Sequence, residues 1–180
     1  MKNVIAYLIL IPSFLLSCSI AQEKSGKIEG NSGINYNESK EMWAEMKEVN
    51  GNSYSYTLEF ISWTGAGSRT TITVKDGIVA ERYYEAFLQK TEDGEHNEEI
   101  TETYTETNDE IGSHEAGAEP LSVDELYELC LAEYLVVNET ENTIYFNTTQ
   151  QGVISECGYV PENCVDDCFR GFQMSHFEWL

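Results

Sequence analysis

Apolar and polar positions alternate through the centre of the chain, residues 54–87, with the period of two that is typical of β-strands with one buried face. Ile72 and Val74 are expected to point inward on the second of three such runs. Asp76-Gly77 separates the second run from the third and favours a two-residue hairpin turn, because both positions accept a positive φ. The three predicted strands are residues 54–60, 69–75 and 78–88.

A turn at residues 64–68, which contains two glycines, is predicted between the first two strands. After a further turn at 91–97 the alternation resumes and predicts a fourth strand at 100–105, exposed on one face. The third strand carries three aromatic side chains, which are expected to pack on a half-exposed sheet face rather than to stack on a ligand. They are Tyr83, Tyr84 and Phe87.

Two stretches have the spacing of helices. In the first, residues 37–39 offer the helix N-cap, and Trp43 is expected to cover the sheet. In the second, Ser122 is the predicted N-cap and Glu125 is its capping-box partner. Cys130 lies on the apolar face of this helix, so a disulfide from it would join the helix to the strands below. The apolar positions of that face are Val123, Leu126, Tyr127, Cys130, Leu131 and Tyr134.

Three more strands are predicted after the second helix, at 142–147, 152–157 and 170–179, with a polar turn at 148–151 between the first two. The order is therefore helix, four strands, helix, three strands. Long strand runs with two interposed helices predict an α+β fold, in which an antiparallel sheet of about six to seven strands has both helices packed on one face.

The N-terminal residues 1–17 place one positive charge, Lys2, ahead of an apolar run that is too short to cross a membrane as a helix. This is the pattern of a secretory signal peptide. Residues 15–18, Leu-Leu-Ser-Cys, resemble the lipobox of bacterial lipoproteins, so Cys18 is expected to become the lipidated N-terminus and to anchor the chain to a membrane through its acyl chains. Ordinary cleavage after Ala21 is the alternative.

The remaining chain divides into two predicted parts. Residues 18–39 are polar, contain three glycines and are expected to form a flexible tether, whereas residues 40–180 form one domain with an acidic insert at 91–119. Within the insert, residues 107–119 have no periodicity and are expected to be a mobile loop. His114 lies in this loop, and nothing in the local sequence orients it for catalysis.

The composition is strongly acidic. The sequence has 10 Lys and Arg against 32 Asp and Glu, a formal net charge of −22, and removal of the signal peptide makes it one unit more negative. Nucleic acid and anionic lipid surfaces are therefore excluded as partners. The acidity is explained by solubility, or by a cationic partner or divalent ions.

Four cysteines remain in the mature chain, and an even number in an exported protein predicts disulfides, here up to two with three possible connectivities. The spacing of the last three also permits a zinc site, although an oxidising compartment competes for the thiolates. The expected compartment is a Gram-negative cell envelope, with the protein anchored to the outer membrane on its periplasmic or surface face. The cysteines are Cys130, Cys157, Cys164 and Cys168.

The order of several short motifs resembles an uncharacterised bacterial family of exported domains and lipoproteins, domain of unknown function 6174. The resemblance covers most of residues 40–180 and implies no activity and no catalytic residues. The acidic insert and the cysteines depart from the family pattern. The motifs are the helix with Trp43, then Tyr54-Ser55-Tyr56, residues 74–79, residues 122–127, residues 152–154, and Asp166-Asp167 before an aromatic strand.

No motif of a known catalytic class is present, so we expect neither enzymatic activity nor a cofactor. His176 is expected to be a strand-face residue, and Asp166-Asp167 near Glu162 to be solvated acids. The sequence predicts a non-catalytic binding or accessory module, which engages an envelope protein or a peptide through a sheet face or edge. The alternatives are a lipoprotein that binds calcium or another divalent cation, and a hydrolase whose active site is assembled from distant residues.

Overall fold

The computed structural model describes residues 28–92 and 95–180. The predicted signal peptide, Cys18 and the start of the predicted tether lie outside them. Among the described residues, no helix is both long and apolar enough to cross a membrane. The elements are helices α2 (Tyr36–Asn50) and α3 (Val123–Leu129), a 3₁₀ turn η1 (Asn108–Glu110), a π-helical turn η2 (Cys130–Tyr134), and strands β1 (Tyr54–Ile61), β2 (Ala66–Lys75), β3 (Ile78–Glu92), β4 (Glu95–Thr107), β5 (Asn142–Thr148), β6 (Ile154–Pro161) and β7 (Arg170–Trp179).

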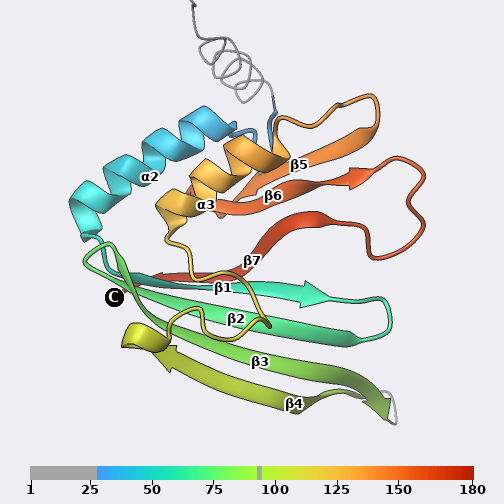
Figure 1. Cartoon of the computed structure of the whole chain (residues 1–180). Coiled ribbons are helices and arrows are strands. Elements are labelled where there is room, and N and C mark those ends of the chain that lie inside the picture. Colours follow the sequence, from blue (N-terminus) through green and yellow to red (C-terminus); the bar gives the residue numbers. More distant parts are fainter. Residues whose placement is uncertain (1–27, 93–94) are drawn as a thin grey trace, which may run out of the picture.

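The seven strands form one antiparallel sheet in the order β4-β3-β2-β1-β7-β6-β5 (Figure 1). This confirms the predicted α+β class and its element order. Strands β1 to β4 form a meander, as expected when hairpins follow one another. The last strand, β7, lies in the middle of the sheet between β1 and β6.

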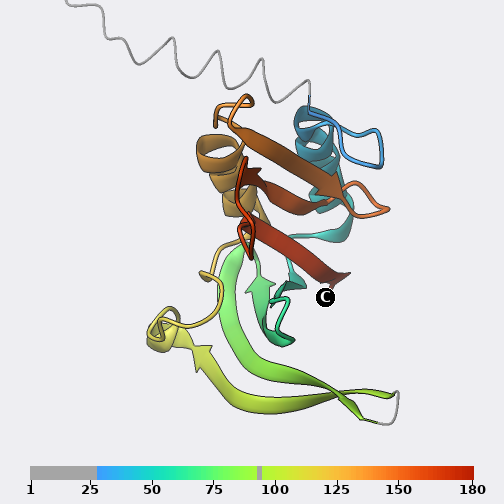
Figure 2. The ribbon, with the colours of Figure 1, turned by 90° about the vertical axis from the view of Figure 1, so that its right-hand side faces the viewer.

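One face of the sheet carries the core. Tyr54, Ile72 and Val74 are fully buried on this face, as the alternation predicts. Helices α2 and α3 cover it over the β7-β6-β5 half, whereas the chain between η1 and α3 runs across the β1 to β3 half (Figure 1). The view in Figure 2 shows the β3–β4 hairpin curving away from the rest of the molecule. We call the helix-bearing side the covered face and the other the open face.

Trp43 joins α2 to the centre of the sheet. Its ring stacks on Trp179 with centroids 5.2 Å apart, and it meets Tyr54 edge-to-face at 5.1 Å. Trp43 is 1% exposed. Aromatic pairs in these geometries add specific attraction to the burial of large apolar surfaces. The prediction that Trp43 covers the sheet is confirmed.

The N-terminus of α2 differs from the prediction. Asn35, not residues 37–39, is the N-cap, and its capping box is completed by Glu38. Ser39 is fully buried, and its hydroxyl donates to the Gly152 carbonyl at 2.6 Å. The expectation of a tether up to residue 39 is therefore wrong for residues 28–39, because this stretch packs against the domain and Tyr36 is 1% exposed.

The second helix begins as predicted. Ser122 accepts from the Glu125 main chain, and the Glu125 carboxylate accepts in return from the Ser122 main chain, so the capping box is complete. The helix then widens into the π-helical turn η2, where Cys130 forms a disulfide with Cys157 of β6. The predicted link between helix and sheet is present.

Of the three turns that join β1 to β4, one agrees with the prediction and two are shorter than expected. At the β2–β3 turn, Asp76 and Gly77 have φ values of 51° and 81°, which confirms the predicted turn. The turn predicted at 64–68 is wrong in extent, since β2 already begins at Ala66. The turn predicted at 91–97 is also too long, because β3 continues to Glu92 and β4 begins at Glu95. Polar residues with little local preference continue as strand there because the partner strand supplies hydrogen bonds.

Candidate binding site

The sheet divides at the pairing of β1 with β7. The two strands pair from Tyr54–Trp179 to Leu58–Met174, and the register shifts at Thr57/Leu58 because Ser175 has no partner in β1. Beyond that bulge β7 pairs only with β6. Residues 59–61 of β1 therefore have a strand neighbour on one side only, β2.

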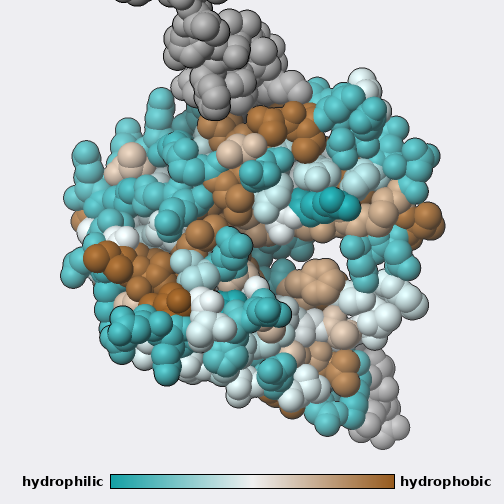
Figure 3. All heavy atoms as spheres, in the orientation of Figure 1, coloured by the Kyte–Doolittle hydropathy of each residue, from teal (hydrophilic) through white to brown (hydrophobic). Residues whose placement is uncertain are grey.

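A gap, which we call the slot, separates residues 59–61 of β1 from residues 171–173 of β7. A cavity of about 290 Å³ opens from it on the covered face, and another of about 290 Å³ is lined by Glu59 and Ile61, whose side chains alternate onto the open face. Glu59 and Gln173 line both cavities. Figure 3 shows the surface hollowed here, to the right of centre.

The covered-face cavity of the slot is mainly apolar. Phe172 is 7% exposed at its base, whereas Phe60 is 52% exposed at its mouth. A neighbouring cavity of about 310 Å³ shares part of this lining and continues toward α3. The apolar and small side chains that line the first cavity are Leu58, Phe60, Gly117, Ala118, Phe169, Gly171 and Phe172.

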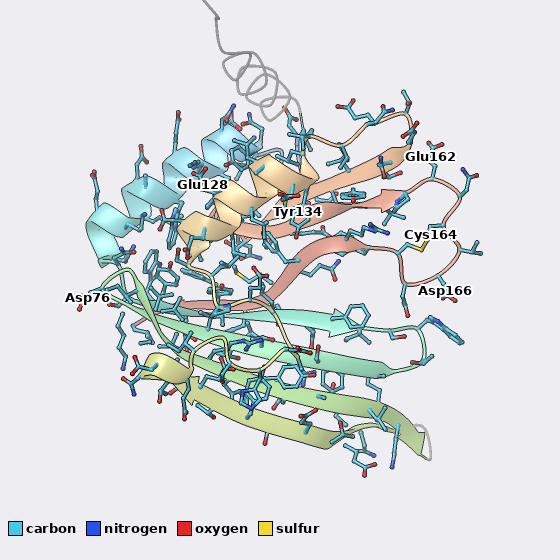
Figure 4. The ribbon with its side chains drawn as sticks, in the orientation of Figure 1. Asp76, Glu128, Tyr134, Glu162, Cys164 and Asp166 are labelled. Atoms are coloured by element: carbon cyan, nitrogen blue, oxygen red, sulfur yellow. A yellow bond between two sulfur atoms is a disulfide. The ribbon has the colours of Figure 1, made fainter. Side chains whose placement is uncertain are left out.

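The loop between β6 and β7 borders the far end of the slot. The Ser62 hydroxyl donates to the Asp167 carboxylate at 2.5 Å. Figure 4 shows Glu162, Cys164 and Asp166 along this loop. Its second disulfide joins Cys164 to Cys168, with the Cα atoms 6.2 Å apart. An apolar cavity thus ends at an acidic loop.

On the open face, Arg69 holds three carboxylates close to the slot. Its guanidinium donates to Glu59 at 2.6 Å, to Glu85 at 3.1 Å and to Glu98 at 2.7 Å. Hydrogen bonds with Glu98 and the other acids raise the pKa of Arg69, and Arg69 lowers the pKa of Glu98. The guanidinium also lies 4.2 Å above the Phe87 ring. Three acids around one base leave this cluster with excess negative charge.

The loop 107–119 forms part of the slot wall, and it is ordered around a buried ion pair. Arg82 and Glu106 are 2% and 0% exposed, and the guanidinium donates to both carboxylate oxygens at 3.0 and 3.1 Å. Arg82 also donates to three loop carbonyls, those of His114, Ala116 and Ala118, at 3.1, 2.5 and 2.9 Å. The expectation of a mobile loop is wrong, because its main chain is tied to charged groups far away in sequence.

Glu106 binds the loop from the other side of the ion pair. Burial alone would raise the pKa of its carboxyl, but the Gly112 and His114 N–H groups, the His114 ring and Arg82 together lower that pKa to about 2. The two N–H groups donate at 2.6 and 2.8 Å. Glu106 is therefore an anion around which the loop folds.

His114 is oriented, contrary to expectation. Its Nδ1 lies 2.9 Å from Glu106 Oε1, and its ring stacks on Tyr104 at 4.0 Å. Ser113 Oγ is 3.3 Å from the same nitrogen. Because carboxylate and hydroxyl meet one ring atom, these residues do not form the relay in which the carboxylate and the nucleophile contact opposite nitrogens.

The other predicted residues lie apart. His176 is an exposed strand-face residue opposite Thr57, as predicted. The four cysteines form two disulfides, Cys130–Cys157 and Cys164–Cys168, which is one of the three possible connectivities. None of these four cysteines is left as a thiolate that could bind zinc. Within residues 28–92 and 95–180, no three His, Cys, Asp or Glu side chains are grouped so as to hold a metal ion. Cys18 lies outside these ranges.

Sequence reasoning did not identify the ion pair or the slot. The ion pair left a signal: Arg82 and Glu106 occupy inward positions, two residues from Tyr84 and Tyr104 respectively, and a charge at an inward position requires a buried partner. The slot depends on a bulge, and alternation alone does not reveal where one strand leaves another.

Comparison with known proteins gives no match of any kind: no family model, no curated protein and no solved structure corresponds to the chain. The resemblance to domain of unknown function 6174 stays a prediction.

Proposed function

We propose that the chain is a lipid-anchored, non-catalytic binding module of a bacterial cell envelope, and that the slot receives apolar side chains of a protein partner. The observation that carries this proposal is the slot itself. It leaves an apolar cavity with the half-exposed Phe60 at its mouth, on the sheet face that carries the core. Accessible apolar cavities of this kind are common binding sites.

The anchoring half of the proposal rests on Cys18 and the apolar run before it. With Cys18→Ala, the chain should appear in the soluble rather than the membrane fraction of cells that produce it. Ala21→Glu, which alters the competing cleavage site, should leave the wild-type fractionation in place. A Cys18→Ala chain that stays with the membrane would overturn the anchor.

The slot is tested by photo-cross-linking in living cells. A photoreactive amino acid at Phe60 should give discrete adducts with an envelope protein. Placed at Ile78, which is 73% exposed at the start of β3, it should not. Adducts that are equal at both positions, or absent at Phe60, would contradict binding in the slot.

The domain of unknown function 6174, which the motif order resembles, implies no activity, and this agrees with a role in binding. A divalent-cation role is the alternative that the acidity of the chain suggests. It has less support, because the described residues offer no cluster of ligands. The oriented His114 does not favour a hydrolase, since the Ser113 hydroxyl approaches the same ring nitrogen as Glu106.

A further inference from the structure

The free edge of β1 directs main-chain groups into the slot. Ser62 N–H donates to Ala66 O of β2 at 2.8 Å, whereas the next residue, Trp63, donates its N–H toward the β7 side, to Asp167 at 3.4 Å. Main-chain groups alternate in direction along a strand, so those of Phe60 face β2 and those of Glu59 and Ile61 face the slot. The edge thus presents two N–H and two C=O groups to an incoming chain.

The side chains of an added strand would point alternately into the two cavities. A residue opposite Phe60 would point to the covered face, into the cavity between Leu58, Phe169 and Phe172. Its neighbours would point to the open face, beside Glu59 and Ile61. The covered-face cavity has room for a leucine or phenylalanine side chain.

The charge of the open face determines which residues of the added strand are favoured there. Arg69 there is surrounded by Glu59, Glu85 and Glu98, so one guanidinium balances only one of three carboxylates. Asp166 and Asp167 lie at the far end, and the whole chain carries −22. Lysine or arginine is favoured at these positions, and acidic residues are repelled.

The other sheet edges fit less well. The outer edge of β5 is partly covered, because Asn31 N–H donates to the Asn147 side chain at 2.8 Å and Ser32 contacts Thr148. The outer edge of β4 carries several glutamates, but none of the cavities described above lies beside it. Only the slot combines a free edge, an apolar cavity and excess negative charge among the described strands.

We propose that the slot binds an extended basic segment of a protein partner, an inference that rests on the proposed function. The segment pairs with residues 59–61 of β1, places an apolar side chain against Phe60 and Phe172, and directs lysine or arginine to the open face. This is β-strand addition with side-chain pockets that set the specificity.

The first test uses the full chain in detergent and a fluorescent heptapeptide that alternates lysine with leucine or phenylalanine. Fluorescence anisotropy should detect saturable binding that weakens as NaCl is added, because the attraction is partly electrostatic. The same peptide with glutamate in place of lysine should not bind. Equal binding of the two peptides would overturn the basic specificity.

The second test distinguishes strand addition from binding by side chains alone, because it removes main-chain hydrogen bonds. N-methylation of the peptide amides that face β1 removes hydrogen-bond donors and keeps every side chain, so binding should weaken by about ten-fold or more. Ile61→Pro removes a donor of β1 that faces the slot and not β2, whereas Ile61→Ala keeps it. The proline variant should bind the peptide far more weakly than the alanine variant.

The outcomes separate this inference from the proposed function. If Phe60 cross-links a partner in cells while the N-methylated peptide binds as well as its parent, the slot stands and strand addition is wrong. If no lysine peptide binds although Phe60 cross-links a partner, the basic ligand is wrong. If Phe60 gives no adduct and no peptide binds, both proposals fail together.

Discussion

Arg82 and Glu106 show how two charges removed from water can organise a loop whose regular structure is limited to the short 3₁₀ turn η1. Taking ions out of water is costly, and their mutual attraction offsets this cost only when further hydrogen bonds satisfy the remaining polar atoms. Here the loop main chain supplies them: carbonyls accept from Arg82, and N–H groups donate to Glu106. The pair and the loop therefore depend on each other.

Gly117 permits a close approach of this loop to the sheet. Its φ is +85°, and a Cβ atom there would lie 2.7 Å from the Tyr84 ring. Only glycine combines that backbone conformation with that contact. The position of this wall of the slot therefore depends on a glycine as well as on the ion pair.

Removing one member of the ion pair should be severe. Arg82→Ala leaves the Glu106 carboxylate buried without its partner, so we expect the free energy of unfolding to fall by about 3–5 kcal/mol. The matched control, Arg69→Ala, removes a partly exposed arginine with three acidic partners and should cost about 1 kcal/mol. Urea unfolding of both variants measures the difference. Equal losses would contradict the role assigned to burial.

Acid should act through Glu106. Its pKa is about 2 in the folded chain, below the ordinary 4.5, so the carboxylate stabilises the fold above pH 4.5 and this contribution is lost as the pH falls toward 2. Between pH 5 and pH 2, the melting temperature of Glu106→Gln should therefore fall less steeply than that of the wild type. Parallel pH profiles for the two proteins would be inconsistent with the depressed pKa.

At the scale of elements, local signals predicted most of the fold. The capping box at Ser122, the Asp76-Gly77 turn and the last strand at 170–179 each follow from a few neighbouring residues, and all are present. The elements that differ from the prediction depend on contacts with residues far away in the sequence. Residues 28–39 pack because Tyr36 and Ser39 both hydrogen-bond to Tyr127 of α3, and no nearby residue indicates this.

The two disulfides should contribute unequally. Cys130–Cys157 closes 27 residues, is fully buried and joins η2 to β6, so its loss should cost about 3 kcal/mol. Cys164–Cys168 closes only 4 residues near the slot, and its loss should cost no more than about 2 kcal/mol.

Mild reductant should open the Cys164–Cys168 bond first, because Cys164 is exposed whereas Cys130 and Cys157 are not. Alkylation and mass spectrometry during a reductant titration would show the order. Thermal unfolding of Cys130→Ala/Cys157→Ala and Cys164→Ala/Cys168→Ala would give the two energies. Prior reduction of the buried bond would contradict its protection by the core.

At the scale of the whole molecule, the dominant fact is a charge of −22. Like charges repel one another in the compact state more than in the unfolded chain. The described ion pairs neutralise few of the acids, and most of those pairs lie at the surface. The packing of the core must therefore outweigh the repulsion between the acidic side chains.

Salt should stabilise the protein. From 0.01 to 0.15 M NaCl the screening length shrinks from about 30 to about 8 Å, so repulsion between acids weakens and the melting temperature should rise. Calcium chloride at matched ionic strength separates screening from binding. An additional rise at millimolar calcium would favour the divalent-cation alternative; no difference from NaCl would count against it.

The position of β7 also sets a schedule for folding during synthesis. The meander β1–β4 and the hairpin β5–β6 are each made of neighbours in sequence, and either can begin to pair as soon as it emerges. The strand that joins them, β7, is produced after the other described strands, yet it lies between them. Until it has been made, β1 and β6 both offer exposed edges to other chains. A nascent chain must therefore be kept from aggregating until β7 has been synthesised.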